Sequence, residues 1–263
     1  MNIFRALGKY IKSVLVIAEL ELRKIRHDQT QIWIRTVQPA LWLAIYGYTM
    51  SNISALSKYL PANISYLQFM TPGILAQSVL FVAIFFGITV VWERDLGLIN
   101  KLLSTPAPRS SIVIGKALSA GVRGIFQAIT IVVLALIMQV HLLLNPLSII
   151  GLFVIIVLLG MCFSALSMAL APIFKTRERM MGIGQAITMP LFFASSAIYP
   201  IEIMPSWIKP IAVVNPLTYV VSGLRGLLAT GDLHQLPLDI LVILGSTVIL
   251  LILASLGFKR LAT

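Results

Sequence analysis

Two Gly-Lys steps, Gly8-Lys9 and Gly115-Lys116, are the points at which this chain comes nearest to a phosphate-binding motif. A loop that cradles nucleotide phosphates needs a second glycine five residues before the Gly of such a pair, because successive backbone amides must wrap around the phosphates. The positions five residues earlier hold Ile3 and Ser110. Nucleotide hydrolysis by this chain is therefore excluded, and another protein must power any work that it does.

The remaining reactive side chains are scattered. His27, His141 and His234 are isolated from one another and from acidic clusters, so they lack the spacing of a metal site. Gly-x-Ser-x-Gly and His-Glu-x-x-His, the motifs of serine and metal hydrolases, do not occur. The single Cys162 stands in an apolar run, which favours a packing role. We expect no catalytic residue, no metal and no cofactor on this chain.

Long stretches without charge dominate the sequence. No Asp, Glu, Lys or Arg lies between Arg123 and Lys175, and the runs 67–92 and 180–201 are equally bare. A bilayer core about 30 Å thick is crossed by roughly 20 apolar residues of helix. With 59% hydrophobic and 11% charged residues, little remains for a soluble domain. We predict an all-α membrane protein with six spans, at about residues 36–53, 67–92, 120–141, 147–172, 181–200 and 238–257.

The distribution of charge predicts the topology. If the N-terminus is inside, 17 of the 20 Lys and Arg residues fall on the inner side. The positive-inside rule then places both termini in the cytoplasm, and it explains the net charge of +11 without nucleic-acid binding. No span carries an ionisable residue near its middle, which argues against an ion-coupled carrier. The lack of a polar or charged ring argues against a channel.

Two segments outside the spans are unusual. In residues 1–30, apolar residues recur every three or four positions opposite a basic stripe, which predicts an amphipathic helix on the inner leaflet or, alternatively, on a protein surface. The region 200–232 is apolar but contains four Pro and three Gly. A single crossing there would bring Lys259 and Arg260 outside. We therefore predict a re-entrant helical hairpin on the outer side, with Asn215 as the cap of its second helix.

The inner loop 93–119 carries mixed charges, a short apolar helix face and a Pro-rich stop. It reads Glu93-Arg94-Asp95-Leu96-Gly97-x-x-x-Lys101-Leu102-Leu103-x-Thr105-Pro106-x-x-Arg109, followed by Gly115-Lys116. The outer region reads Tyr199-Pro200-x-Glu202-x-Met204-Pro205-x-Trp207, then Asn215-Pro216-Leu217-Thr218-Tyr219 and Arg225. Together and in this order, over about residues 30–257, these runs resemble type-2 ABC exporter permeases. The run Val37-Gln38-Pro39-Ala40-Leu41-Trp42 further resembles the daunorubicin-resistance branch.

The resemblance implies a permease of a bacterial-type plasma (inner) membrane that pairs with a second copy of itself. It also implies two copies of a separate ABC ATPase, which carries the ATP and Mg. The first inner loop of such permeases docks on the ATPase. By position, the expected docking residues are Glu93, Arg94, Asp95, Gly97, Thr105 and Arg109, although simple solvated loop charges remain the alternative.

The family architecture places the second and fifth spans along the central route. The expected pathway residues are Gln77, Ser78, Phe81 and Phe85 with Gln185, Thr188, Met189 and Phe192, for which ordinary helix packing is the alternative. The expected outer gate is Asn215, Pro216, Tyr219 and Arg225, or else these residues form a rigid cap on the dimer. Such a permease would export a hydrophobic drug-like or lipid-linked compound. A polysaccharide or lipooligosaccharide cargo, or a non-transporting assembly scaffold, are the alternatives.

Overall fold

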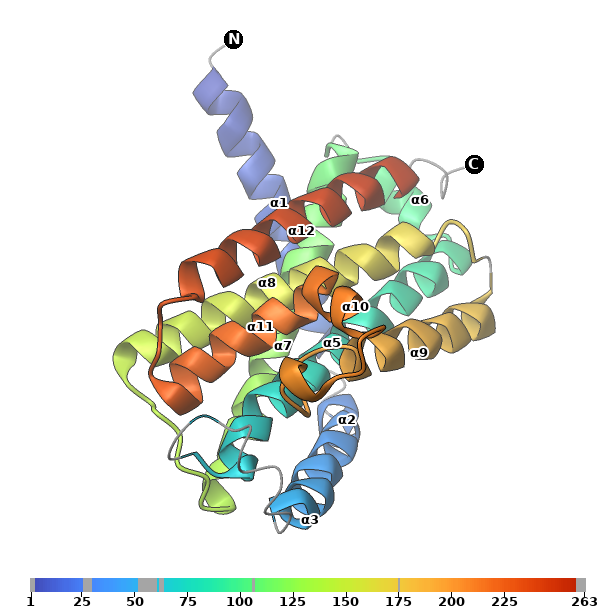
Figure 1. The fold of residues 1–263 in the computed structure, drawn as a ribbon. Helices are drawn as coiled ribbons and strands as arrows, with labels where there is room; N and C mark the ends of the chain where they lie inside the picture. The colour runs from blue at the N-terminus through green and yellow to red at the C-terminus, as the bar shows by residue number, and fades with distance from the viewer. Residues whose placement is uncertain are drawn as a thin grey trace.

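The computed structural model describes residues 3–25, 30–51, 61, 64–105, 107–174 and 176–258, and every regular element in these ranges is a helix (Figure 1). Along the chain these are α1 (Ile3–Ile25), α2 (Thr30–Leu41), the π-helical turn η1 (Trp42–Tyr46), α3 (Gly47–Ser51), α5 (Tyr66–Asp95), α6 (Leu98–Leu103), α7 (Arg109–Ile137), α8 (Pro146–Leu170), α9 (Arg177–Phe193), the 3-10 turn η2 (Ile201–Ile203), α10 (Lys209–Val214), α11 (Pro216–Arg225), the π-helical turn η3 (Gly226–Thr230) and α12 (Leu236–Phe258). The prediction of an all-α fold is confirmed for these residues.

Four helices are long and apolar enough to cross a membrane, namely α5, α7, α8 and α12. They coincide with the second, third, fourth and sixth predicted spans. The helix α7 begins at Arg109, eleven residues before the predicted span. The reason is that Ile112, Val113 and Ala117 are buried against other helices, so that the helix continues beyond its uncharged part.

The other two predicted spans correspond to shorter helices. The first divides into α2, η1 and α3, with Pro39 inside α2, and its predicted last residues 52 and 53 lie outside the described ranges. The fifth corresponds to α9, which has 17 residues and contains Pro190. At 1.5 Å per residue, α9 reaches about 26 Å, slightly less than the core of a bilayer. The crossing of the membrane by these two segments remains a prediction.

The helix α5 forms the centre of the bundle and packs against α7, α8, α9 and α11. Its most apolar stretch is 89% buried inside the protein itself. Small residues bring the neighbouring backbones close together. Gly121 of α7 and Gly160 of α8 face each other so closely that a Cβ on Gly160 would lie 2.5 Å from the Gly121 Cα. Such small-residue contacts are typical of helix packing in membranes.

The N-terminal helix α1 packs on α7, and its first turns project beyond the rest of the bundle (Figure 1). Val14, Ile17 and Ala18 are buried in this contact, whereas Leu7 and Ile11 are about half exposed. The predicted helix is therefore present. One apolar stripe of α1 meets protein, and a second stripe stays exposed in the described chain.

The region after α9 is made of short helical pieces, as its Pro and Gly content indicates. Asn215 caps α11 as predicted, because its Oδ1 accepts a hydrogen bond from the Leu217 amide at 3.0 Å and Pro216 occupies the first turn. The helix α11 packs on α12 and α5. The half-crossing of this region remains a prediction.

Candidate functional site

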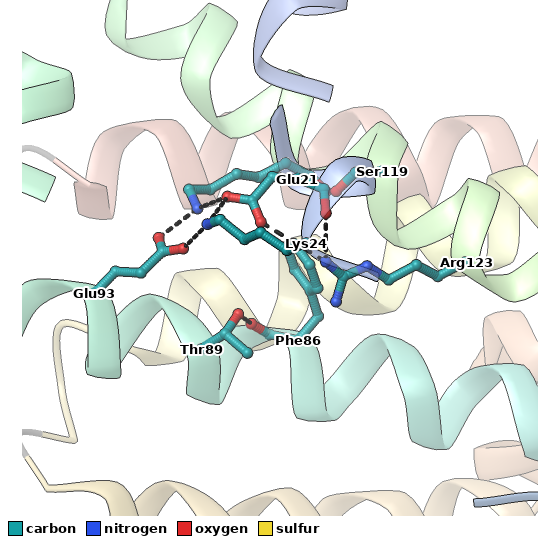
Figure 2. A network of polar contacts seen from close by, with 8 residues as sticks. Glu21, Lys24, Phe86, Thr89, Glu93, Ser119 and Arg123 are labelled. Carbon is teal, nitrogen blue, oxygen red and sulfur yellow. Dashed lines mark hydrogen bonds and ion pairs between the residues drawn. The ribbon is translucent and has the colours of Figure 1, made fainter. Parts of the chain in front are cut away.

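Five charged side chains from three helices form an ion cluster with a buried centre and an exposed Lys24, defined here as Glu21, Lys24, Glu93, Lys116 and Arg123. The Lys116 Nζ donates to Glu21 Oε1 at 2.5 Å and to Glu93 Oε2 at 2.5 Å. The Lys24 Nζ bridges the same two carboxylates, at 3.1 Å and 2.6 Å. In Figure 2, Glu21 of α1 and Glu93 of α5 point toward each other, with Lys24 close to both. The ion cluster therefore ties α1 and α5 to α7.

The ion cluster joins two carboxylates to three cations around a buried centre. Lys116 is fully buried, and Glu21 and Glu93 are 4% and 7% exposed. Arg123 closes one side, since its Nη2 donates to the Glu21 carbonyl at 2.8 Å and its guanidinium lies over the Phe86 ring. A buried charge is tolerated only where partners replace its lost water. Here Lys116, Lys24 and Arg123 compensate the two carboxylates, which satisfies that requirement.

The pKa of Glu21 reflects both its burial and its ion pairs. Burial by itself raises the pKa of this carboxyl, but the charge and hydrogen bond of Lys116, assisted by Lys24, outweigh that effect and hold the pKa below its ordinary value of 4.5. In the same way, Lys24 is destabilised as a cation by burial, and its hydrogen bond to Glu93 and the charge of Glu21 raise its pKa above 10.5. Both groups are therefore charged at neutral pH.

Gly115 allows α1 to reach the ion cluster. A Cβ at this position would lie 2.8 Å from the Val14 carbonyl oxygen and 2.8 Å from the Ile17 Cβ, so any side chain would force the helices apart. Nearby, the Tyr10 hydroxyl donates to the Ser110 Oγ at 3.0 Å. The Gly115-Lys116 step thus provides a close helix contact and a buried cation. It does not form a phosphate-binding loop.

The inner loop leaves α5 after Asp95, two residues beyond Glu93. Gly97 adopts a left-handed conformation, with φ of 70°, which only glycine tolerates readily and which turns the chain from α5 into α6. The predicted short helix of the loop is confirmed as α6, whereas the predicted stop at Pro106 lies outside the described residues. The ion cluster therefore fixes both helices that flank the loop, α5 and α7.

The predicted docking residues divide into two groups. Asp95, Thr105 and Arg109 are exposed on or beside the loop. Arg94 pairs with Asp95 at 3.0 Å, and Arg177 of α9 approaches Asp95 at 3.5 Å. Glu93, by contrast, points into the ion cluster and away from solvent. The structure thus brings the exposed members to one loop, while Glu93 holds that loop to the bundle.

The predicted pathway residues lie on α5 and α9, which pack against each other. Gln77, Ser78, Phe81, Thr188 and Phe192 are buried in the described chain. Gln185 is exposed, whereas Phe85 and Met189 are half-buried. The side-chain amide of Gln77 has no hydrogen-bond partner among the described residues, although it is fully buried. This makes Gln77 the one member of the group whose polarity the described packing does not explain.

The predicted outer residues secure the chain where α9 ends. The Asn215 Nδ2 donates to the carbonyls of Leu191 and Ala194, at 2.7 Å and 3.0 Å. The Arg225 Nη2 donates to the Ser196 carbonyl at 2.6 Å, and its guanidinium lies 3.7 Å from the centre of the Phe69 ring. These side chains satisfy carbonyls that no helical amide serves, which irregular backbone requires if it lies at the predicted membrane depth.

Tyr219 and Pro216 complete the predicted outer group. The Tyr219 hydroxyl donates to the Val213 carbonyl at 2.9 Å in an exposed position. This contact fixes α11 to the preceding α10, whereas the bonds of Asn215 fix the start of α11 to the end of α9. The geometry of the group is that of a stiff support, which agrees with the cap alternative as well as with a gate.

The sequence reasoning did not find the ion cluster, although a signal was present. In α1, Glu21 follows Val14, Ile17 and Ala18 at helical spacing, so that a carboxylate stands within the buried apolar stripe. A charge on such a stripe needs a partner of opposite sign. That partner, Lys116, is separated from Glu21 by 95 residues, and only the fold brings the two together.

These features define a polytopic helical membrane protein with a charged loop held by buried ion pairs. The family model of the ABC-2 type transporter matches residues 12–229, so this chain belongs to the ABC-2 type transporter family and is a membrane transport permease by family. The family predicted from the loop and outer motifs is thereby confirmed.

Several curated relatives of this chain are named as permeases. The chain is 30% identical over 211 residues to the putative transport permease ycf38 of Porphyra purpurea, which covers 77% of this chain and 71% of the relative. It is 26% identical to the inner membrane transport permease YadH of Escherichia coli K12, covering 78% and 80% of the two chains. It is 23% identical to the daunorubicin resistance permease DrrB1 of Streptomyces coeruleorubidus, covering 77% and 70%.

Proposed function

We propose that this chain is the membrane-spanning subunit of an ATP-driven exporter in the inner membrane. Two copies would form the path for the cargo, and two copies of a separate ABC ATPase would supply ATP, Mg and the driving force. Family membership and the names of the relatives support this proposal. The observation that carries it is the ion cluster, because it couples the inner loop rigidly to three helices.

In this proposal the exposed Asp95, Thr105 and Arg109 contact the ATPase. Movement of the ATPase would displace the loop, and Glu93 and Lys116 would pass that displacement to α5 and α7. Since α5 lies at the centre of the bundle, a shift of α5 reaches most other helices. α1 would move with them, because Glu21 and Lys24 hold it to the same cluster.

The cargo would pass along the surface between two copies of the chain. Gln185 and the half-buried Phe85 and Met189 provide a mixed aromatic, thioether and amide surface on α5 and α9. Such surfaces suit an amphipathic and largely apolar molecule. A hydrophobic drug-like or lipid-linked cargo fits this lining better than a polysaccharide, which would need many hydrogen-bonding groups.

The proposal is tested by co-purification of the chain with its ABC ATPase and by ATP turnover in liposomes. We expect Arg109→Glu to weaken ATPase binding and to abolish the stimulation of ATP hydrolysis by cargo, without a change in the melting temperature of the permease. The control is Lys209→Glu, which reverses a charge on the predicted outer side. It should leave both properties unchanged.

The outcomes separate the alternatives. If Arg109→Glu binds the ATPase and supports export as the unaltered chain does, the docking role of this loop is wrong. If the complex forms but no compound is exported and none stimulates ATP turnover, the chain is a scaffold and not a transport subunit.

A further inference from the structure

Two adjoining cavities lie at the end of α5 opposite the ion cluster, between α11, the first turn of α12 and the loop around η2. The larger has a volume of about 510 Å³ and the smaller about 190 Å³. Ser222, Arg225, Gln235 and Asp239 line both. Phe69, at the wall of the larger cavity, is separated from Glu93 by 24 residues of α5, or about 36 Å of helix. The cavities are therefore distinct from the ion cluster.

The walls of these cavities carry an excess of negative charge. Glu202 and Asp239 line the larger cavity, Asp232 and Asp239 line the smaller, and Arg225 is the single cation among the described residues that line them. Arg225 is already engaged with the Phe69 ring and with the carbonyls of Ser196 and Phe69. Three carboxylates line the cavities, and the one cation, Arg225, already has other partners. This excess of negative charge favours a positively charged ligand.

The carboxylate of Asp239 is the most unusual group in these walls. Asp239 is only 2% exposed, and Ser222 is a hydrogen-bond partner of its carboxyl, but its Oδ2 has no partner among the described residues. Its position in the first turn of α12 offers it the positive end of the helix dipole, which is a weak stabilisation. Burying an ionised carboxylate costs considerably more than that unless a cation or hydrogen-bond donor compensates it. Among the described residues Ser222 is the one hydrogen-bond partner of this carboxyl and no cation pairs with it, so the remaining unpartnered oxygen points to a ligand.

The rest of the lining indicates an organic cation and not a metal ion. The residues that the structure describes contain no group of three His, Cys, Asp or Glu that could hold a metal. Val213 and Leu238 also line the larger cavity and are more than half exposed at its edge. An ammonium group could thus reach the carboxylates while an attached hydrocarbon chain lies on these apolar side chains.

We propose that these cavities bind the ammonium head group of an amphipathic primary amine, with Asp239 as its main partner and Glu202 as an accessory one. The Tyr219 ring, which lines the larger cavity, adds a surface for the alkyl part. The site lies in a single copy of the chain. Binding there requires neither ATP nor the ATPase, so it stands apart from the proposed transport function.

The test uses the full-length permease, without the ATPase, in nanodiscs of phosphatidylcholine. Because Cys162 is the only cysteine and is buried, Cys162→Ser with Ser222→Cys gives a single thiol at the wall of both cavities. The rate of its reaction with an uncharged maleimide is measured with decylamine and with decanol. We expect decylamine to slow the reaction and decanol, of equal chain length, to leave it unchanged.

Asp239→Asn in the same background should weaken the protection by decylamine roughly tenfold in concentration, because one hydrogen bond to a charged group is lost. Glu19→Gln, which removes an exposed carboxylate of α1, should not weaken the protection by decylamine. A second measurement on the chain with native Ser222 is the rise in melting temperature with decylamine, which Asp239→Asn should reduce. Equal protection by decanol, or full protection in Asp239→Asn, would overturn the proposal.

Discussion

At the scale of single residues, Lys116 is the most informative side chain of this permease. It is a fully buried lysine in contact with two carboxylates, one on α1 and one on α5. Neither contact is visible from its sequence neighbours, which are apolar or small. Its ammonium group compensates Glu21 and Glu93 at once, so its removal would leave two buried carboxylates with Lys24 and the more distant Arg123.

We expect Lys116→Ala to lower the free energy of unfolding by about 3–5 kcal/mol, the usual effect of breaking a buried ion pair. The double variant Lys116→Met with Glu21→Gln should lose less than the sum of its two single variants, by about 1–3 kcal/mol, because both charges disappear together. Reversible unfolding in mixed micelles measures this difference. Lys101→Ala, on exposed α6, is the control and should stay within about 0.5 kcal/mol. Additive effects would disprove the coupling.

The lowered pKa of Glu21 predicts a loss of stability in acid. A carboxyl whose pKa is lower in the folded than in the unfolded chain stabilises the fold above the unfolded value, here 4.5, and this contribution disappears as the pH falls through the folded pKa. We expect the melting temperature to be steady from pH 7 to about pH 5 and to fall below that. Glu21→Gln should show a smaller acid-dependent fall. An identical pH profile for both proteins would exclude Glu21 as a contributor.

At the scale of helices, the contact between α1 and α7 depends on a backbone approach that only Gly115 permits. The amphipathic pattern of α1 predicts a surface helix, and its exposed stripe with Leu7 and Ile11 agrees with this. Its other stripe is held by protein, through Val14, Ile17 and the ion cluster. The N-terminal helix is thus joined to the loop that precedes α7.

Gly115→Val should push α1 away from α7 and weaken the ion cluster. We expect faster hydrogen exchange over residues 7–25 and a loss of about 1–3 kcal/mol in the free energy of unfolding, as overpacked sites generally show. Gly245→Val is the matched control, since a side chain at Gly245 of α12 meets no atom within 4 Å. Unchanged exchange in α1 of the Gly115→Val protein would contradict the close contact.

At the scale of the whole molecule, the two ends of α5 face opposite sides of the proposed membrane. The inner loop and ion cluster lie at one end, and the cavities with Arg225 and Asp239 lie at the other. The distribution of Lys and Arg predicts that the loop end is cytoplasmic. Which end of α5 faces the cytoplasm can be measured directly.

Single cysteines in a Cys162→Ser background measure this orientation in intact cells. Lys209→Cys on α10 should react with a membrane-impermeant maleimide from outside, and Lys101→Cys on α6 should react only after the membrane is opened. The predicted positive inner side requires this result. Labelling of Lys101→Cys in intact cells would reverse the topology and exclude a cytoplasmic inner loop.

The sequence by itself determined the all-helical fold, the four helices long and apolar enough to cross a membrane, the family and the cap at Asn215. Each of these depends on local properties: uncharged length, helical spacing, or a short motif whose residues are neighbours in the chain. For the same reason, the short helix α6 and the amphipathic helix α1 could be predicted.

Only the tertiary structure decided which charges are buried. Glu93 belongs to the predicted docking loop, yet its side chain points into the ion cluster. Gln77, a polar residue, is buried at the centre of the bundle. Lys116 and Glu21, or Arg225 and Ser196, are distant in the chain, and their pairing depends on how the helices pack. Hydropathy measures the cost of placing a residue in lipid, but it contains no information on the partner that offsets this cost.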